Sequence, residues 1–493
     1  MTATQHSTAK PDQGRCPYSG TPDGVGPETL VRETRLPRAA MIRDAARYGL
    51  NYRHGWLDRI AGHDFTRFRT GNRAVVSIGN PELIDQVLHE DRQSYYKSFE
   101  YELLRALLGV SLFTDEEDSW ERHRLMLSPM FGKRHLNGLV DLMIEPIDAL
   151  CDALAAEPNQ ERFEVEMGDE MVKLTLNVVG NSLFSKGFGP IAESIAPQVT
   201  GGLRFAERSI RVFFIYSPTP KVWRGLARVA FTPLPLPPPF WTIQQTVKHL
   251  DNAVWGVIND RRAHPIDSPD LLNHLLNASD DEGSLTLKRV RDESLTFMLA
   301  GHETTANALT WMWYLLSINP KARQRVYDEV DSVLQGRTPT ADDLADLPYT
   351  TGAFLEAMRY FSPAWLIPRR AIRDTSIGGH RIKKGTTVII PVHQVHHDPR
   401  WWPNPQEYDP SRFLPGAGKG RPRSAYLPFG GGRRICIGQG FATMESVLIT
   451  AMLAQRYVFD LVPDHPVEPE GTLTLRPKHG MKMVARRRTE VIR

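Results

Sequence analysis

The sequence predicts a mainly α-helical fold with small β-sheets, an α+β arrangement in one large body. Apolar residues recur at helical spacing, with charged residues on the opposite face, over residues 139–155, 243–263 and 321–335. Strand-like runs are short and few, and they occur at 74–78, 386–392 and 482–485. Because no repeat or Ser/Gly linker divides the chain, we expect a flexible tail over 1–35 and a single domain over 36–493.

Composition argues against several classes of protein. Of 493 residues, 41% are hydrophobic and 24% are charged, which is typical of a globular chain and not of a disordered or fibrous one. The net charge of +3, from 60 basic and 57 acidic residues, provides no overall field for a nucleic-acid partner. The scattered cysteines fit neither a disulfide framework nor a zinc site, and they favour a reducing compartment: Cys16, Cys151 and Cys436.

No segment has the pattern of a membrane anchor. Residues 1–27 are polar and lack the apolar centre of a signal peptide. The longest uncharged stretch, between Glu303 and Lys321, is interrupted by Asn and Pro and is marginal for a spanning helix. We therefore expect a cytoplasmic protein with no transmembrane anchor. The aromatic segment 213–223 leaves two interpretations open: a loop tucked under the body, or a surface that admits substrate or touches a membrane.

The strongest local signal is the run FGGGRRICIG at residues 429–438. Three consecutive glycines cost backbone entropy, so they occur where a positive φ or a close backbone approach is needed. A helical pattern over 441–457 places Cys436 just before a helix N-terminus, where N–H groups and the helix dipole favour a thiolate. Such a thiolate, shielded by Phe429, suits a haem iron. A small buried cysteine beside a glycine turn is the alternative.

The run resembles the FxxGxRxCxG haem loop of cytochrome P450 monooxygenases at five positions: Phe429, Gly432, Arg434, Cys436 and Gly438. Further motifs of the family lie upstream of this run in the order that the family shows, so the resemblance covers nearly the whole chain. It implies the cytochrome P450 fold, with haem b (iron protoporphyrin IX) between a long central helix and the cysteine loop. It also implies that Cys436 is the iron ligand and that Phe429 lies beside the cofactor.

Residues 300–305, AGHETT, resemble the family's oxygen-binding motif and lie in an uninterrupted helical pattern. Ala300 and Gly301 remove side-chain bulk, so that a flat cofactor and a diatomic ligand can approach the helix. We expect Thr304 to bond the carbonyl four residues back. Glu303 and Thr304, an acid beside an alcohol, are candidates for passing protons toward oxygen. Without the cysteine loop, this motif would read as an ordinary polar turn.

Glu356 and Arg359 lie one helical turn apart and match the family's ExxR pair. In isolation such a pair is usually solvated and contributes little stability. In the family it is buried and joined by an arginine of a downstream irregular segment. Arg412, in the long Pro- and Gly-rich stretch 401–418, is the expected third member. The resemblance therefore assigns these residues a structural role.

Four residues are candidates for contacts with the haem propionates. Trp120 and Arg124 match the family's WxxxR, and their indole N–H and guanidinium suit carboxylates. Arg369 and Arg434 resemble further propionate partners, although the adjacent Arg370 leaves the choice between 369 and 370 open.

The resemblance implies a monooxygenase that inserts one oxygen atom from O₂ into an apolar small molecule, such as a fatty acid, terpenoid, sterol or polyketide. Mostly apolar side chains occupy the candidate pocket segments, which are 99–112, 213–223, 297–302 and 364–367. Electrons would come from a separate ferredoxin- or flavodoxin-type donor with its reductase. Basic residues between Lys419 and Arg434 form a candidate docking surface for such an acidic partner, and ordinary surface charge is the alternative.

Two other function classes compete with the monooxygenase. One is a haem-thiolate protein of different chemistry, such as a peroxygenase or isomerase, and the other is a haem-based ligand-binding protein. Both are disfavoured by the acid–alcohol pair of Glu303 and Thr304, which an oxygen-activating enzyme needs for proton delivery.

Overall fold

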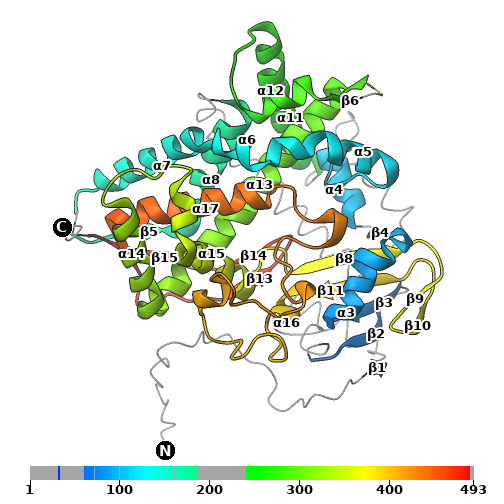
Figure 1. Cartoon of the computed structure of the whole chain (residues 1–493). Helices are drawn as coiled ribbons and strands as arrows, with labels where there is room; N and C mark the ends of the chain where they lie inside the picture. The colour runs from blue at the N-terminus through cyan, green and yellow to red at the C-terminus, as the bar shows by residue number, and fades with distance from the viewer. Residues whose placement is uncertain are drawn as a thin grey trace, which may run out of the picture.

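Most helices gather on one side of the protein, and the largest sheet lies on the other (Figure 1). The computed structural model describes residues 31–33, 60, 62–70, 73–98, 100–159, 161–185, 240–280 and 283–488. The predictions for Cys16, Phe99 and the segment 213–223 lie outside the described residues, and of the predicted tail over 1–35 only residues 31–33 are described. The division into a tail over 1–35 and one domain over 36–493 therefore stays a prediction.

The helical part is built around α13, which runs over 32 residues from Leu287 to Ile318. Thr286 caps its N-terminus by accepting the Arg289 N–H, and the helix ends where Asn319 precedes Pro320. Its C-terminal half is buried on all sides, because it lies between other helices and not at the surface. At 1.5 Å per residue the helix spans about 48 Å, enough to cross the whole body.

The helices predicted from periodicity are confirmed. Segments 139–155, 243–263, 321–335 and 441–457 correspond to four long helices: α7 (Val140–Ala155), α11 (Phe240–Ala263), α14 (Pro320–Leu334) and α17 (Gln439–Arg456). Other helices are α3 (Pro81–Asp85), α4 (Glu100–Leu108), α5 (Glu117–Leu127), α6 (Lys133–Asn137), α8 (Met167–Phe184), α12 (Leu271–Asn277), α15 (Pro348–Tyr360) and α16 (Val392–His396). Among the described residues, no helix is long and apolar enough to cross a membrane.

The largest sheet has six strands in the order β1-β2-β3-β11-β8-β4. Their bounds are Val31–Glu33, Phe65–Thr70, Arg73–Ile78, Thr387–Pro391, Leu366–Ala371 and Tyr95–Lys97. The strands β3 and β11 were predicted, whereas β8 and β4 were not. Smaller sheets join β12 (Tyr457–Leu461) with β15 (Lys482–Arg487) and β5 (Phe163–Glu166), and pair β6 (Ser279–Asp280) with β7 (Gly283–Ser284), β9 (Thr375–Ile377) with β10 (His380–Ile382), and β13 (Pro469–Gly471) with β14 (Leu475–Pro477).

The pair of Glu356 and Arg359 on α15 is fully buried, as the resemblance implies. Arg359 donates from Nε and Nη2 to the two carboxylate oxygens at 2.7 and 2.8 Å. Its Nη1 donates to the carbonyls of His396 and Pro405, each at 2.9 Å. Arg412 is the third member, with Nε 3.3 Å from Glu356 Oε1. The cluster therefore holds the irregular segment 397–418 against α15.

His396 links this cluster to Leu427, which lies two residues before the cysteine loop. Its Nε2 accepts the Leu427 N–H at 2.8 Å, so its Nδ1 carries the proton and donates to Arg359 O at 3.2 Å. Burial, with the charge of Arg359 as a smaller contribution, lowers the pKa of His396 to about 3. The imidazole is therefore neutral at physiological pH, which this pair of hydrogen bonds requires.

Candidate functional site

The cysteine loop is held by its backbone. Gly432 has φ of +69°, and a Cβ at this position would lie 2.1 Å from the carbonyl oxygen of Leu88, so no other residue fits. The Cys436 N–H donates to Phe429 O at 2.9 Å, which closes the loop. Helix α17 begins at Gln439, three residues after Cys436, as the pattern predicted. The local sequence thus fixes where the thiol points relative to the helix.

The electrostatics of Cys436 differ from the expectation that the helix N-terminus favours a thiolate. The Gly438 N–H and the charge of Arg124 lower the pKa of the thiol, but burial outweighs them and the net effect is to raise it. Protein groups alone therefore favour the neutral thiol. A metal cation at Sγ would reverse this balance, because a coordinated thiol is deprotonated outright. The donor set fits a metal ligand better than a free nucleophile.

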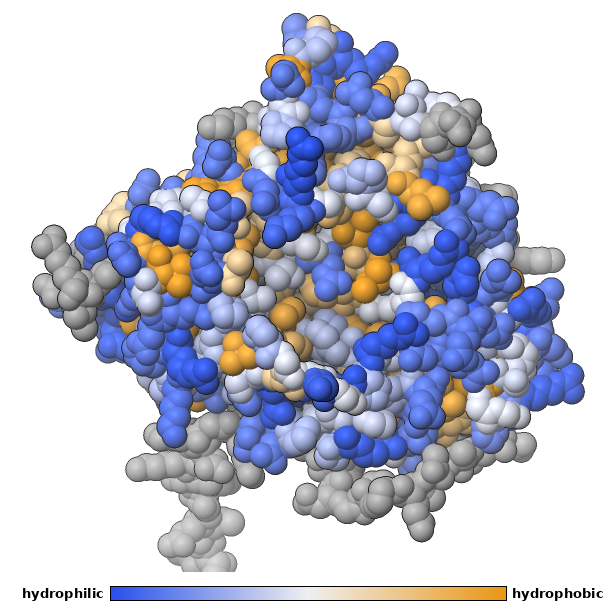
Figure 2. Space-filling model, in the orientation of Figure 1, coloured by the Kyte–Doolittle hydropathy of each residue, from blue (hydrophilic) through white to orange (hydrophobic). Residues whose placement is uncertain are grey.

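Cys436 and Ala300, which the resemblance places on opposite sides of the cofactor, are both exposed to solvent. Burial nevertheless dominates the pKa of Cys436, as expected for a thiol that faces a hollow in the protein. Ala300 is exposed in the middle of α13, where Leu299 and His302 are buried. Ile435, the residue before Cys436, is apolar and also exposed. Figure 2 shows apolar residues gathered in a recessed area of the surface. A flat apolar group fits this lining, because it would cover area otherwise left in water.

The polar motif on α13 has the local geometry that was predicted for it. Thr304 Oγ1 donates to Ala300 O at 2.6 Å, the bond to the carbonyl four residues back. Glu303 Oε1 accepts the hydroxyl of Thr474, from the turn between β13 and β14, at 2.8 Å. Asn307 Nδ2 donates to the same hydroxyl oxygen at 3.1 Å. Burial raises the pKa of Glu303, so the group is suited to holding a proton.

Gly301 and His302 face the neighbouring helix α8. A Cβ at Gly301 would lie 3.0 Å from Val179 Cγ2, so close packing against α8 also favours glycine at this position. The Thr175 hydroxyl donates to His302 O at 2.9 Å, which joins the two helices further. The His302 side chain is buried, and this burial lowers its pKa to about 4, so the imidazole is neutral at physiological pH.

Arg124 and Trp120 lie on α5, near the thiol. Among the described residues, the Arg124 guanidinium has no hydrogen bond or ion pair, and burial lowers its pKa while the charge of Cys436 acts to raise it. A partly buried cation without a partner is costly, so this site fits an anionic group that the described residues do not supply. Arg434 stacks on the Trp120 ring at 3.9 Å, donates to Asp115 O at 2.7 Å and pairs with Glu116.

Arg369 and Lys97 are neighbours in antiparallel register on β8 and β4. Arg369 is buried, whereas the adjacent Arg370 alternates to the other face of the strand. Burial first, and then the charges of Arg434 and Arg369, lower the pKa of Lys97, and Glu116 opposes this. Three cations therefore gather with fewer acids than they need, which fits a carboxylate-bearing ligand. Sequence reasoning missed Lys97, because a lone lysine in a three-residue strand carries no signal.

Some predicted pocket residues belong to the apolar core. Leu104, Trp365 and Ile367 are all buried in it, and the Trp365 indole donates to Thr472 O at 3.1 Å. Their place in the substrate pocket therefore stays a prediction, because an apolar residue in a matched segment does not show which way it faces. Phe297 is half-buried and packs edge-on against Phe131 at 5.3 Å.

Comparison with known proteins places this geometry in a family. The family model described as "Cytochrome P450" matches residues 59–483. Cytochrome P450 132 of Mycobacterium tuberculosis is 50% identical over 92% of this chain and 97% of its own length. Cyclooctatin synthase of Streptomyces melanosporofaciens is 33% identical over 84% of this chain and 86% of its own length. The crystal structure of the cytochrome P450DA heme domain superimposes with a TM-score of 0.75 at 27% identity, covering 86% of this chain and 90% of that one.

Proposed function

This chain belongs to the cytochrome P450 family, and from that premise we propose which residues, substrate class and electron donor serve its reaction. Members of the family are haem-thiolate monooxygenases that use O₂ and electrons from a redox partner. For this chain we propose the insertion of one oxygen atom into an apolar small molecule. The observation that carries the proposal is the accessible Cys436 thiol in a hollow lined by Ala300 and apolar side chains.

Cys436 is the proposed iron ligand and haem b the proposed form of the cofactor. When bound, the haem supplies the electron and oxygen chemistry of the reaction, and the thiolate favours cleavage of the O–O bond. Covalent attachment of a c-type haem would need two cysteines in a CxxCH run, and the sequence has none. The Phe429 carbonyl holds the Cys436 N–H, and the half-buried Phe429 side chain limits access of water to the sulfur.

The proposed partners of the haem carboxylates are the basic and indole groups near the hollow. Arg124 offers an unpaired guanidinium, and Trp120 offers an indole N–H with no protein acceptor among the described residues. Lys97 belongs to the same set as Arg369 and Arg434, because the positive charges of the two arginines repel it and lower its pKa. Two negative charges placed among these side chains would offset that repulsion. Arg370 is left out, because it faces away from them.

Thr304 and Glu303 are the proposed proton-handling residues. The Thr304 hydroxyl donates its hydrogen bond to Ala300 O, so the hydroxyl oxygen can still accept a hydrogen bond from a group in the hollow. Glu303 holds a proton at higher pH than an ordinary carboxyl, and Thr474 fixes one of its oxygens. A chain of two groups that each accept and release a proton suits general acid catalysis.

Replacing Thr304 with alanine tests this role. We expect product formation to fall by about 100-fold, within the range that general acid–base groups contribute, while substrate affinity is unchanged. Thr310 is a matched control, since its hydroxyl donates to Ala306 O at 2.7 Å on the same helix, away from Ala300. The measurement is product formed per electron pair consumed. If Thr304→Ala and Thr310→Ala lowered product formation equally, the loss would come from disturbing α13 and not from proton delivery by Thr304.

The proposed substrate is apolar and of medium to large size. Ala300 and Ile435 contribute no charge to the hollow, and the cations near it are accounted for by the haem carboxylates. A titration with fatty acids, terpenoids, sterols and polyketides, read as a substrate-induced change in the haem spectrum, tests the class. Tighter binding of small charged acids than of any apolar compound would contradict the proposal.

A ferredoxin- or flavodoxin-type electron donor is proposed to dock near Lys419. Most of the basic residues predicted for docking already have partners. Arg421 stacks on Trp402 at 3.7 Å, Arg423 pairs with Asp85 at 3.1 Å, and Arg433 pairs with Glu121. Lys419 is exposed and has no partner among the described residues, so its charge is available to an acidic protein.

Reversing the charge of Lys419 is therefore expected to slow electron transfer. In Lys419→Glu the rate of the first reduction should fall about fivefold at low salt and approach the wild-type rate at high salt, because screening removes the effect. Lys173→Glu, an exposed position on α8, should leave the rate unchanged. Stopped-flow reduction by each donor type measures this. A rate for Lys419→Glu that equals that of Lys173→Glu would refute the docking site.

A further inference from the structure

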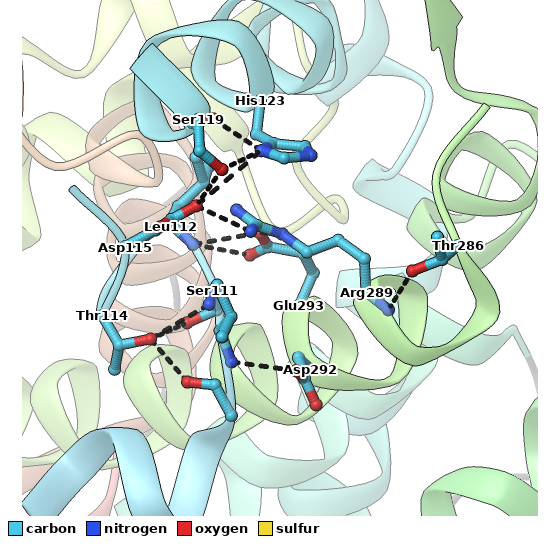
Figure 3. Close-up of polar contacts among 12 residues, drawn as sticks. Ser111, Leu112, Thr114, Asp115, Ser119, His123, Thr286, Arg289, Asp292 and Glu293 are labelled. Atoms are coloured by element: carbon cyan, nitrogen blue, oxygen red, sulfur yellow. Dashed lines mark hydrogen bonds and ion pairs between the residues drawn. The ribbon is translucent and has the colours of Figure 1, made fainter. Parts of the chain in front are cut away.

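We infer that Glu293 and Arg289, near the beginning of α13, are positioning residues for the cations that bind the haem carboxylates. Neither residue belongs to the motifs of the cysteine loop or of the oxygen side. The inference rests on the proposed function, because it takes Lys97 and Arg434 as carboxylate-binding groups. Figure 3 shows the polar contacts on which it depends, between α13 and the loop that precedes α5.

Glu293 accepts hydrogen bonds from the backbone N–H of Leu112. Its two carboxylate oxygens lie 3.0 and 3.1 Å from the Leu112 N–H, so the amide donates to both. Arg289 Nε donates to Glu293 Oε1 at 2.8 Å from one turn away on the helix. The Glu293 side chain is completely buried. A buried carboxylate of this kind is retained only where its hydrogen bonds are all well formed.

Arg289 extends the contact to a second point of the same loop. Its Nη1 donates to Asp115 Oδ2 at 2.8 Å, and both side chains are buried. Asp115 Oδ2 also accepts the Ser119 hydroxyl at 2.8 Å, which ties the loop to the first turn of α5. One guanidinium thus joins Glu293 to Asp115 and fixes two points of the loop that lie three residues apart (Figure 3).

Lys97 and Arg434 donate hydrogen bonds to backbone carbonyls of the same loop. Lys97 Nζ donates to Leu112 O at 3.2 Å and also to Phe113 O. Arg434 Nη1 donates to Asp115 O at 2.7 Å. The loop residues 112–115 therefore lie between α13 and the two cations, with N–H and carboxylate groups turned to the helix and carbonyls turned to Lys97 and Arg434. Moving the loop would move both cations.

Burying the Glu293 carboxylate destabilises the fold, whereas an apolar side chain could pack against the loop without this cost. Burial raises the pKa of Glu293 to about 7, although Arg289 and the Leu112 N–H act to lower it. Keeping this group ionised at neutral pH is therefore unfavourable, and an apolar residue would fill the space at lower cost. The matching gain is a fixed backbone at Leu112, because Glu293 holds its N–H while its own carbonyl, in the next peptide unit, accepts from Lys97.

Asp292 provides a matched control on the same helix. It is buried and accepts the Val110 N–H at 2.9 Å, so it also pins the loop. Gly109 lies so close that a Cβ there would be 2.2 Å from its Oδ2. Asp292 makes no contact with residues 112–115 in the described structure. It shares burial, charge and loop anchoring with Glu293 and differs in which peptide group it holds.

Release of haem from the holoenzyme to excess apomyoglobin tests the inference. We expect release about 10-fold faster in Glu293→Gln than in the wild type, the usual scale for loss of a residue that orients a ligand-binding group. Asp292→Asn should change the rate less than about twofold. Native circular dichroism in both variants ensures that folded proteins are compared. If Glu293→Gln does not accumulate, Asp115→Asn tests the same path from the loop side.

A double variant distinguishes positioning through Lys97 from a general effect. If Glu293 acts through Lys97, the change caused by Glu293→Gln should shrink to less than about twofold in the Lys97→Met background. Fully additive effects, or equal effects of Glu293→Gln and Asp292→Asn, would overturn the inference while leaving the proposed cations intact. Wild-type haem release in Lys97→Met alone would instead refute the proposed role of Lys97, on which the inference rests.

Discussion

Replacing Cys436 with serine is expected to abolish the spectroscopic signature of thiolate ligation. The reduced carbon-monoxide complex should lose the Soret band position that sulfur ligation produces, because a serine hydroxyl is not a thiolate donor. Monooxygenase turnover should fall by more than about 1000-fold, equivalent to about 4 kcal/mol of lost transition-state stabilisation. The carbon-monoxide difference spectrum and the rate of product formation are the two measurements.

Cys151→Ser is the control for this experiment. Cys151 is buried on α7, where Arg456 Nη1 lies 3.2 Å from its sulfur, and burial raises the pKa of its thiol to about 11. The variant should retain the thiolate spectrum, since this sulfur is buried on α7 and bonds only Arg456 among the described residues. A wild-type spectrum in Cys436→Ser, or a thiolate spectrum lost equally in both variants, would disprove the assignment of the iron ligand.

Breaking the buried pair of Glu356 and Arg359 is expected to have the largest effect on stability. Glu356→Gln leaves Arg359 as a buried cation with reduced compensation, and removal of one partner of such a pair costs about 3–5 kcal/mol. Domains are stable by about 5–15 kcal/mol in total, so the variant should bind haem poorly and lose the native fold under mild conditions. Haem content per protein and denaturant unfolding measure the loss.

An exposed pair with the same spacing serves for comparison. Lys173 Nζ lies 2.8 Å from Glu170 Oε1 on α8, three residues apart, and the lysine is 65% exposed. Lys173→Ala should cost less than about 0.5 kcal/mol, because solvent screens such pairs. If Glu356→Gln were as mild as Lys173→Ala, the cluster would not be what holds the segment 397–418 in place.

The sequence predicted well those features that arise from local chemistry. The bond from Thr304 to Ala300 follows from helical geometry alone, and the tight loop before α17 follows from its glycines. The family pattern correctly implied the burial of Arg359 and its third partner Arg412, which spacing alone could not have shown.

Features that depend on contacts between distant segments were missed or misread. Strand β8 was overlooked because Pro368 and two arginines interrupt its apolar pattern, although its register with β4 brings Arg369 beside Lys97. The packing of Gly301 against Val179 of α8 was missed, while its predicted place beside the cofactor stays a prediction. The electrostatics of Cys436 were predicted from the helix end, whereas burial by the whole fold decides the direction of its pKa shift.

The contact between Gly432 and Leu88 has a consequence for the order in which the protein assembles. The two residues are 344 positions apart in the sequence, and the carbonyl of Leu88 leaves no room for a side chain at Gly432. The cysteine loop therefore takes its shape against a surface that the ribosome has made far earlier. Such a long-range contact closes slowly, because a large loop entropy precedes it. The proposed carboxylate-binding groups at 97, 124 and 369 are also synthesised before Cys436. Cofactor capture is therefore expected late in assembly, after Cys436, helix α17 and the strands that follow it have been made.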